Sequence, residues 1–255
     1  YNVLMVVMVR YWFFAAFVTA IAYRKAGGIR AAARTEQPLL QILRGLILAT
    51  EICVMIYAFT LLGLIESHAV FTSYPLLVAA LSGPILGEVV GWRRWTAIFI
   101  GFVGVLIILK PGFGVFSPAA IVPLAAALLF ALYGLLTRFA SRKDTAATSF
   151  FWTGVSGSVM MTVIGASYWE PMISSDWIWM GTLCITGALG HWLLIKTYEA
   201  AEASAVQPFA YLQLVFVSFI GVLVFGESIE LNVAIGAAVV VCAGLFTLWR
   251  ARQAA

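Results

Sequence analysis

Charged residues are scarce in this sequence. Only 10% of its 255 residues are Asp, Glu, Lys or Arg, while 63% are hydrophobic, and the mean hydropathy is +1.03. Soluble domains carry about 25% charged residues and about 45–50% apolar ones, so a water-soluble globule and a disordered chain are both excluded. The apolar stretches are about 20 residues long, unlike the ~10-residue alternating strands of an outer-membrane barrel. The sequence therefore predicts an all-α, multi-pass membrane protein.

Cysteine and histidine are also rare. The three cysteines, Cys53, Cys184 and Cys242, lie in apolar stretches without a Cys-x-x-Cys spacing. We interpret them as packing residues rather than disulfide or metal partners. No P-loop, His-Glu-x-x-His or nucleotide-binding glycine fingerprint occurs, and no basic cluster with interleaved aromatic residues suggests nucleic acid. We therefore expect no cofactor, no metal and no nucleic-acid partner.

Nine apolar stretches are candidate membrane spans, and turn residues and charges separate them. They cover, approximately, residues 3–23, 39–64, 67–86, 93–109, 117–138, 146–168, 177–199, 203–225 and 231–249. Backbone polar groups cannot stay unpaired in lipid, so helices are the expected spanning element.

Basic residues are unevenly divided between the two sides of this arrangement. If the loops alternate, eleven Lys and Arg residues fall on one side and only Lys110 falls on the other. The positive-inside rule assigns the basic side to the cytoplasm, so we expect a cell (inner) membrane protein with a cytoplasmic C-terminus. Tyr1 is then outside, which suggests a tenth, N-terminal helix before residue 1.

The two halves of the chain share a short pattern. Residues 78–88 read Val-Ala-Ala-Leu-Ser-Gly-Pro-Ile-Leu-Gly-Glu and align without a gap with residues 217–227, Val-Ser-Phe-Ile-Gly-Val-Leu-Val-Phe-Gly-Glu. Five predicted spans separate Glu88 from Glu227, so the two copies end on opposite faces of the membrane. That arithmetic is typical of the inverted repeats of secondary transporters, and chance similarity between apolar helices is the alternative.

A longer stretch around each copy resembles a known family. Residues 58–88, from Ala-Phe-Thr-Leu-Leu-Gly to Pro-Ile-Leu-Gly-Glu, and residues 196–227, from Lys-Thr-Tyr-Glu-Ala-Ala to Leu-Val-Phe-Gly-Glu, resemble the two repeat signatures of the EamA-like family. This family belongs to the drug/metabolite transporter superfamily. The resemblance implies a ten-helix fold of two inverted five-helix repeats, at 1–110 and 111–255, with nine helices visible here. It also implies a central substrate cavity and alternating access, but members carry many metabolites, so it does not identify the substrate.

Six ionisable residues lie inside the predicted spans. Each costs about 2.5–3.5 kcal/mol on insertion scales and is therefore a candidate for the site. They are Arg10, Arg44, Glu51, His68, His191 and Lys196. Four of them, Arg10, Arg44, His191 and Lys196, are possible cations that accompany one deep acid, Glu51. This balance favours an anionic or zwitterionic small molecule such as an amino acid.

Arg44 and Glu51 are the first candidates for substrate contact, together with His191. The two are seven residues apart and share one helical face about 10 Å apart, so a substrate or water could bridge them. Arg10 is a further candidate that could point into an outward-open vestibule. The alternatives are that Arg10 and Arg44 snorkel to the interfaces, and that Glu51 is a protonated carboxyl bonded to a neighbouring helix.

The remaining polar candidates have similar alternatives. His68 lies at a predicted helix start, where an interfacial position is the other interpretation. His191 could be a buried neutral histidine, and Lys196 could pair with Glu199. Glu51 and the histidines are the groups that could couple protons to transport.

Aromatic residues in the spans could line the cavity and stack on a substrate. Trp192, Tyr74 and Tyr211 join the predicted substrate-binding set for this reason, although membrane interfaces and packing are the ordinary places for such residues. We expect a monomer or homodimer in the lipid bilayer, with protons as a possible coupling ion.

Ser156 supports an alternative of another class. Gly154-Val-Ser-Gly157 matches the Gly-x-Ser-Gly around the nucleophile of rhomboid-type intramembrane serine proteases, and His191 at a similar depth could be its base. Small-residue clusters are also routine helix-packing sites, and an inverted repeat has no place in that fold. We therefore expect a transporter rather than an enzyme, with a non-transporting receptor or scaffold as a third interpretation.

Overall fold

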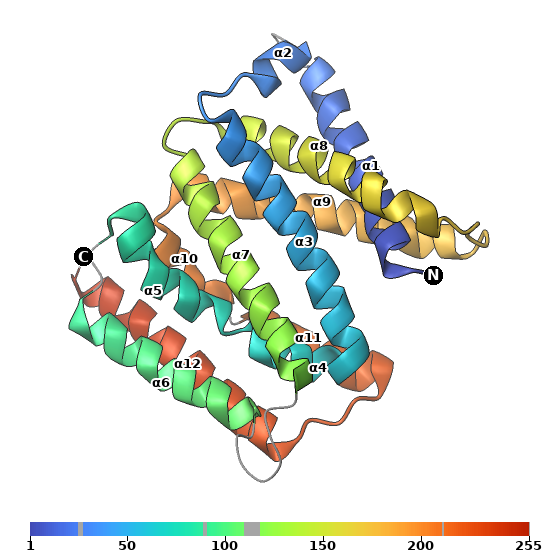
Figure 1. The fold of residues 1–255 in the computed structure, drawn as a ribbon. Helices are drawn as coiled ribbons and strands as arrows, with labels where there is room; N and C mark the ends of the chain where they lie inside the picture. The colour runs from blue at the N-terminus through green and yellow to red at the C-terminus, as the bar shows by residue number, and fades with distance from the viewer. Residues whose placement is uncertain (25–27, 89–90, 110–117, 211, 255) are drawn as a thin grey trace. The chain divides into compact units, whose positions relative to one another are not determined.

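The computed structural model describes residues 1–24, 28–88, 91–109, 118–210 and 212–254, and within them every regular element is a helix (Figure 1). The α-helices are α1 (Val3–Arg24), α2 (Gly28–Ala33), α3 (Pro38–Leu62), α4 (Leu64–Phe71), α5 (Tyr74–Leu86), α6 (Trp92–Leu109), α7 (Ile121–Ala140), α8 (Ala146–Gly165), α9 (Asp176–Ala200), α10 (Ala203–Ala210), α11 (Leu212–Phe225) and α12 (Leu231–Ala254). Two 3₁₀ turns complete the described elements: Pro118–Ala120 directly precedes α7, and Ala166–Tyr168 directly follows α8.

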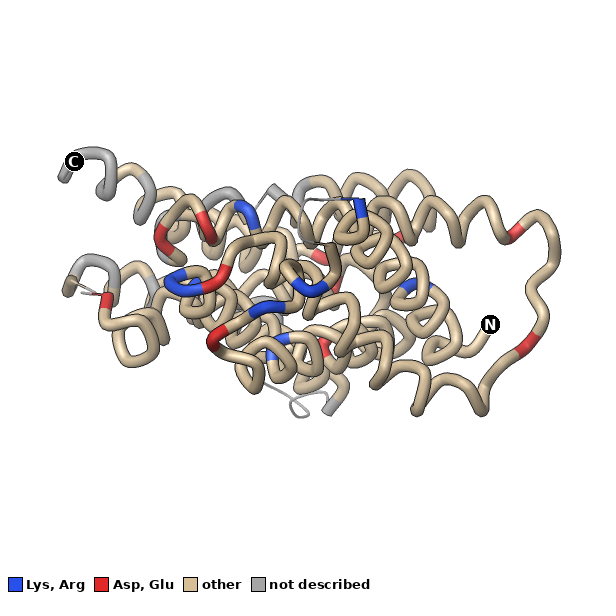
Figure 2. Tube along the Cα trace, turned by 90° about the horizontal axis from the view of Figure 1, so that it is seen from above, with Lys and Arg blue, Asp and Glu red and all other residues tan. Residues whose placement is uncertain are grey.

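Six helical stretches of the described chain are long and apolar enough to cross a membrane. They are Val3–Arg24, Pro38–Leu62, Leu64–Leu86, Ile121–Ala140, Ala146–Tyr168 and Asp176–Ala200. Charged residues are correspondingly sparse along the trace (Figure 2). The prediction of an all-α, multi-pass membrane protein is confirmed.

The chain divides into two compact units. Unit 1 comprises Tyr1–Cys53 and Leu136–Ala200, and unit 2 comprises Val54–Leu135 and Ala201–Ala255. The boundaries fall inside α3 and α7, so each of these helices contributes to both units.

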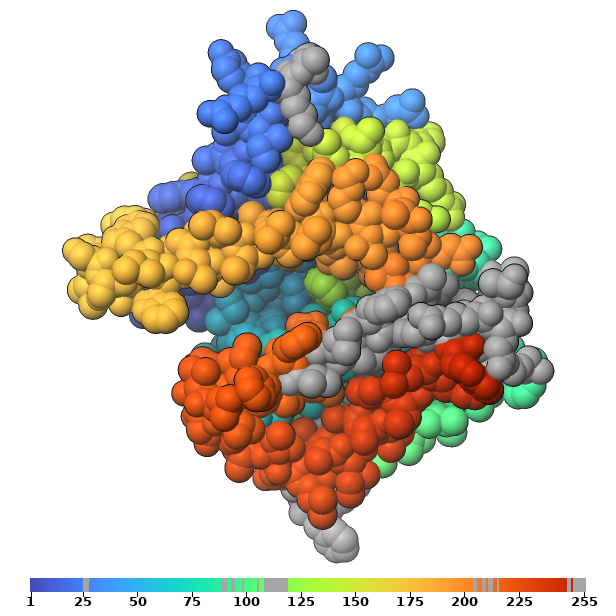
Figure 3. Space-filling model, turned by 180° about the vertical axis from the view of Figure 1, so that it is seen from behind, coloured from blue at the N-terminus to red at the C-terminus, as the bar shows by residue number. Residues whose placement is uncertain are grey.

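In unit 1, α8 packs along α1 through a face of glycines. Gly154, Gly157 and Gly165 all lie against α1; an added Cβ would collide with that helix at Gly157 and Gly165 and would be tightly packed at Gly154. Gly154 faces the Phe14 ring and Gly157 faces the Tyr11 ring. Small residues let helices approach closely, which is how membrane helices gain packing contacts without a hydrophobic drive. Helix α9 then lies across α1 and α8 (Figure 3).

In unit 2, α6 packs against α12 through glycine as well. Gly104 of α6 faces Gly236 of α12, and the two helices run antiparallel (Figure 1). Helix α5 contacts α10, and α4 contacts α11. One cluster of buried apolar residues in this unit comprises Ile65, Ala69, Val70, Leu214, Val233 and Val240.

Helix boundaries in unit 2 recur along the sequence. The first residues of α4 and α10 (64 and 203), the last residues of α5 and α11 (86 and 225), and the first residues of α6 and α12 (92 and 231) each differ by 139. The Gly-Glu pattern ends α5 and α11, with Gly87 at φ +72° and Gly226 at φ +66°. Only glycine adopts this left-handed conformation without strain, and it closes the helix C-terminus. The repeated Gly-Glu pattern is therefore explained by the left-handed backbone conformation that ends each of these helices.

Candidate functional site

Arg10 of α1 and His191 of α9 meet inside unit 1. A guanidinium nitrogen of Arg10 lies 3.0 Å from Nε2 of His191. A guanidinium can only donate, so Nε2 accepts and the ring is neutral, with its proton on Nδ1. Phe14 stacks on the imidazole, with 6.2 Å between ring centroids and 4° between ring planes. The arginine therefore has a fixed partner within the membrane-spanning part of the chain.

Gly187 makes room for this guanidinium. It lies four residues, about one turn, before His191 on α9. A Cβ at Gly187 would come within 2.6 Å of Arg10 Nε. The sequence Gly187-Ala-Leu-Gly-His thus supplies both the space for the arginine and its hydrogen-bond acceptor.

Glu51 of α3 is the acid of this cluster. Its side chain is buried, at 4% exposure, and the positive charge of Arg10 acts on its carboxyl group. Among the described residues it has no hydrogen-bond partner. We call Arg10, Glu51 and His191 the Arg10 cluster: a guanidinium, a carboxyl and an imidazole from three spans of one unit.

Arg44 lies in a different polar network. Its Nε donates to Thr137 Oγ1 at 3.0 Å, and a second guanidinium nitrogen donates to the side-chain oxygen of Gln41. The amide nitrogen of Gln41 in turn donates to Asp144 at 2.7 Å and to Ser149 at 3.1 Å. Arg44 and Gln41 are fully buried. The network ties α3 to α8 and to the end of α7, so the Arg44 guanidinium already has partners within the protein.

Lys196 forms an ion pair with Glu199, which is on the same helix. Its ammonium lies 2.6 Å from the Glu199 carboxylate and 5.4 Å from the centre of the Trp192 ring. Both charged side chains are partly exposed. The i, i+3 ion pair and the cation–π contact are the short-range interactions expected on one helix face.

The His68 side chain bonds to the backbone of its own helix in unit 2. Its Nδ1 donates to the Leu64 carbonyl at 3.0 Å, and Phe59 stacks on the ring at 5.0 Å. The position 139 residues later is Gln207, whose amide donates to the Ala203 carbonyl at 2.6 Å. An uncharged amide makes the same bond in the other copy, so the bond does not depend on imidazole protonation.

The aromatic candidates lie in both units. Tyr74 packs in unit 2 against Phe71 at 5.1 Å and Phe130 at 4.7 Å. Trp192 packs in unit 1 with its ring edge-on to Phe150 at 5.0 Å. Tyr211 lies outside the described residues. The structure thus gives Tyr74 and Trp192 aromatic neighbours.

Ser156 and His191 do not form a nucleophile–base pair. The Ser156 hydroxyl donates to the Trp152 carbonyl at 2.6 Å, and it packs against Gly45 of α3. The acceptor nitrogen of His191 is taken by Arg10. The protease alternative therefore finds no support. Within the described ranges, no group of three or more His, Cys, Asp or Glu side chains could hold a metal ion.

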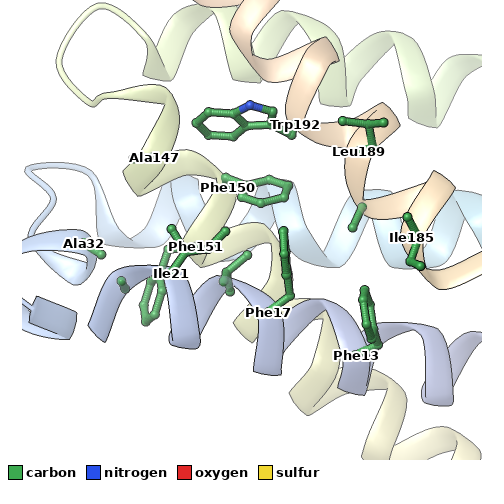
Figure 4. A pocket seen from close by; sticks show the side chains of 13 residues that line it. Phe13, Phe17, Ile21, Ala32, Ala147, Phe150, Phe151, Ile185, Leu189 and Trp192 are labelled. Atoms are coloured by element: carbon green, nitrogen blue, oxygen red, sulfur yellow. The ribbon is translucent and has the colours of Figure 1, made fainter. Parts of the chain in front are cut away.

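Sequence reasoning did not identify an apolar pocket in unit 1. Its volume is about 390 Å³, and four elements, α1, α2, α8 and α9, line it. Figure 4 shows Phe13 and Phe17 from α1, Phe150 from α8 and Trp192 from α9 around the space. Of its lining residues only Trp192 was a sequence-based candidate, because the others are ordinary apolar residues of separate spans.

Comparison with known proteins agrees with the fold. The model of the EamA-like transporter family matches residues 1–110 and 117–249. A riboflavin transporter of Vibrio cholerae is 30% identical over 241 residues, which cover 93% of this chain and 81% of that protein. An S-adenosylmethionine uptake transporter of Rickettsia bellii is 27% identical over 221 residues, with 87% of this chain and 76% of that protein covered. A solved crystal structure superposes with a TM-score of 0.74 at 16% identity, over 99% of this chain and 90% of that one.

Proposed function

Because this chain belongs to the EamA-like transporter family, within the drug/metabolite transporter superfamily, we propose that it is a secondary active transporter of a small metabolite. It works by alternating access around a central cavity, with the two repeats at 1–110 and 111–255. We place it in the cell (inner) membrane with its C-terminus in the cytoplasm. The names of the similar transporters of S-adenosylmethionine and riboflavin support a small organic solute.

The Arg10 cluster is the observation that carries the substrate proposal. Ionisable groups in membrane spans are costly and are kept where they face a substrate or ion path. In unit 1, Arg10 bonds to His191 and its positive charge acts on Glu51, so these three groups interact. A guanidinium binds a carboxylate by two parallel charge-assisted hydrogen bonds, and Glu51 can take a substrate ammonium. An anionic or zwitterionic solute fits these two groups.

Proton coupling follows from the same cluster. Glu51 has no hydrogen-bond partner among the described residues, so its carboxyl group can take up a proton or a substrate ammonium. His191 accepts from Arg10, and protonation of that nitrogen would end the bond and release the guanidinium. Binding of a proton and binding of a carboxylate are thereby linked through Arg10.

The other predicted contacts keep narrower roles. Arg44 fixes α3 through its bonds to Thr137 and Gln41 and becomes a substrate contact only if that network opens. Lys196 and Trp192 form a cation–π pair on α9, and the Trp192 ring could stack on a planar solute. Tyr74 and Tyr211 remain stacking candidates.

Transport in proteoliposomes tests the proposal. Uptake of amino acids, organic acids, S-adenosylmethionine, riboflavin and organic cations is measured with and without a pH gradient. We expect a carboxylate-bearing solute to be carried, and Arg10→Gln to lower its uptake about 100-fold, equivalent to about 2.8 kcal/mol. Glu51→Gln should remove the effect of the pH gradient.

The control is Arg142→Gln, which removes an exposed positive charge far along the sequence from the cluster. Its uptake should match that of the unmodified protein. Uptake of organic cations alone would overturn the charge assignment and leave Glu51 as the principal contact. Binding without any uptake would favour a receptor.

A further inference from the structure

The pocket of unit 1 has no charged lining. All 13 of its lining residues are Phe, Trp, Ile, Leu, Val or Ala. A cavity of about 390 Å³ lies in the size range of small-ligand sites. Burying a charge against such a surface would cost several kcal/mol, so its occupant is apolar where it touches these walls. None of the three residues of the Arg10 cluster lines this pocket, so the two differ in chemistry.

The length of the pocket matches one leaflet of a bilayer. Along α1 its lining runs from Phe13 to Ala22, nine residues or about 14 Å. One half of a ~30 Å hydrocarbon core is about 15 Å. Phe17, Ile185 and Leu189 at the pocket are 41%, 59% and 54% exposed. These side chains belong to membrane-length helices, so they open the pocket sideways to lipid tails.

Three arginines lie next to one end of the pocket. Arg24 ends α1 two residues after the lining residue Ala22, and Arg30 and Arg34 lie on either side of the lining residue Ala32. All three side chains are exposed. None makes a side-chain hydrogen bond or ion pair with another described residue. This end is thus basic and open, and the other end, at Phe13, lies deep in the span.

We propose that this pocket binds an anionic phospholipid. One acyl chain lies between α1, α8 and α9, and the phosphate lies on Arg24, Arg30 and Arg34. The acid that follows them in sequence, Glu36, is 3.5 Å from Lys143 and so has its own cation. Basic groups beside apolar clefts between spans select anionic head groups, and the bilayer supplies this ligand at high concentration.

The head-group half of the proposal is tested by charge removal. The purified, delipidated full chain is titrated with phosphatidylglycerol and with phosphatidylcholine of the same acyl chains, and bound lipid is counted by native mass spectrometry. We expect phosphatidylglycerol to bind at least tenfold more tightly. The double variant Arg24→Gln/Arg30→Gln should lose about fivefold per arginine for phosphatidylglycerol and nothing for phosphatidylcholine. Arg142→Gln, an exposed arginine outside the pocket, should change neither.

The acyl-chain half is tested by filling the pocket. Ala188→Phe on α9 and the milder Ala32→Phe on α2 add a ring to its wall, and both should weaken binding of the two lipids at least tenfold. Thr186→Phe adds the same ring at an exposed position of α9 that does not line the pocket and should leave binding unchanged. Equal binding of the two lipids to the unmodified protein would overturn the proposal. So would full lipid binding by both filled variants, or occupation of the pocket by riboflavin and not by lipid.

Discussion

Unit 2 and unit 1 use the internal repeat differently. In unit 2 the copies agree in helix boundaries and in the left-handed glycines Gly87 and Gly226. They also agree in the hydrogen bond that His68 and Gln207 each make to the carbonyl four residues earlier. Unit 1 contains the ionisable cluster, and there the copies differ. At the same 139-residue shift its members pair with residues that carry no charge: Arg10 with Ser149, Glu51 with Gly190 and His191 with Ile52.

This difference separates what the fold needs from what the site needs. Positions that are alike in both copies meet requirements of backbone geometry and packing, and these requirements are the same in both copies. A substrate site has no such requirement and needs one guanidinium, one carboxyl and one imidazole. We infer that substitutions in unit 2 change stability more than transport, and that substitutions around the Arg10 cluster do the reverse.

The largest expected effect on stability is at Glu227 of unit 2. Its carboxylate accepts hydrogen bonds from the backbone N–H groups of Leu64 at 2.7 Å and Ile65 at 2.8 Å, the first residues of α4. Removing it leaves two helix-terminal donors without their acceptor, and each such loss costs about 1–3 kcal/mol. Glu227→Ala should therefore lower the free energy of unfolding by about 3 kcal/mol.

Thermal unfolding in detergent measures this loss, and Glu227→Gln is the matched variant, since its amide oxygen can still accept. Its loss should be less than half as large. If Glu227→Ala unfolds at the temperature of the unmodified protein, the cap on α4 contributes nothing to the stability of unit 2.

Sequence reasoning identified the elements and the family. The predicted spans lie on the observed helices, and the resemblance drawn from residues 58–88 and 196–227 is confirmed by the family match over 1–110 and 117–249. Long apolar runs and repeated glycines are local signals, so the sequence carries them directly. The ion pair of Lys196 with Glu199 could be predicted from the sequence for the same reason, because residues three positions apart on a helix lie on the same face.

Contacts between segments that are distant in the sequence could not be predicted from the sequence. The third span was expected to begin at residue 67, whereas α4 begins at Leu64 because Glu227 caps it from 163 residues away. Arg10 and His191 are 181 residues apart, and no spacing rule joins them. Arg44 and Glu51 were paired by helical spacing, but the Arg44 side chain bonds to Thr137 of α7. Helical periodicity gives the face and leaves the partner helix undetermined.

A smaller loss of stability is expected where α6 crosses α12 in unit 2. A Cβ at Gly104 would lie 2.8 Å from the Gly236 carbonyl oxygen, and backbone cannot move aside as a side chain can. Overpacking of this kind costs about 1–3 kcal/mol. Gly104→Ala should lower the free energy of unfolding by about 2 kcal/mol while uptake per folded molecule stays the same. Thermal unfolding and proteoliposome uptake on one preparation decide this, and a variant that folds normally but transports poorly would contradict it.

The smallest and most selective effect is expected at Gly187 in unit 1. Gly187→Ala places a methyl group against the Arg10 guanidinium, while alanine itself favours the helix by up to about 1 kcal/mol. Stability should therefore hold or rise, and the KM for the transported solute should rise about tenfold, equivalent to about 1.4 kcal/mol. Gly190→Ala on the same helix is the matched control, since a Cβ there meets nothing within 4 Å. It gains the same helix propensity and should keep its KM. Equal KM values for the two variants would mean that the position of Arg10 does not matter for transport, and the Arg10 cluster would then be a packing feature like those of unit 2.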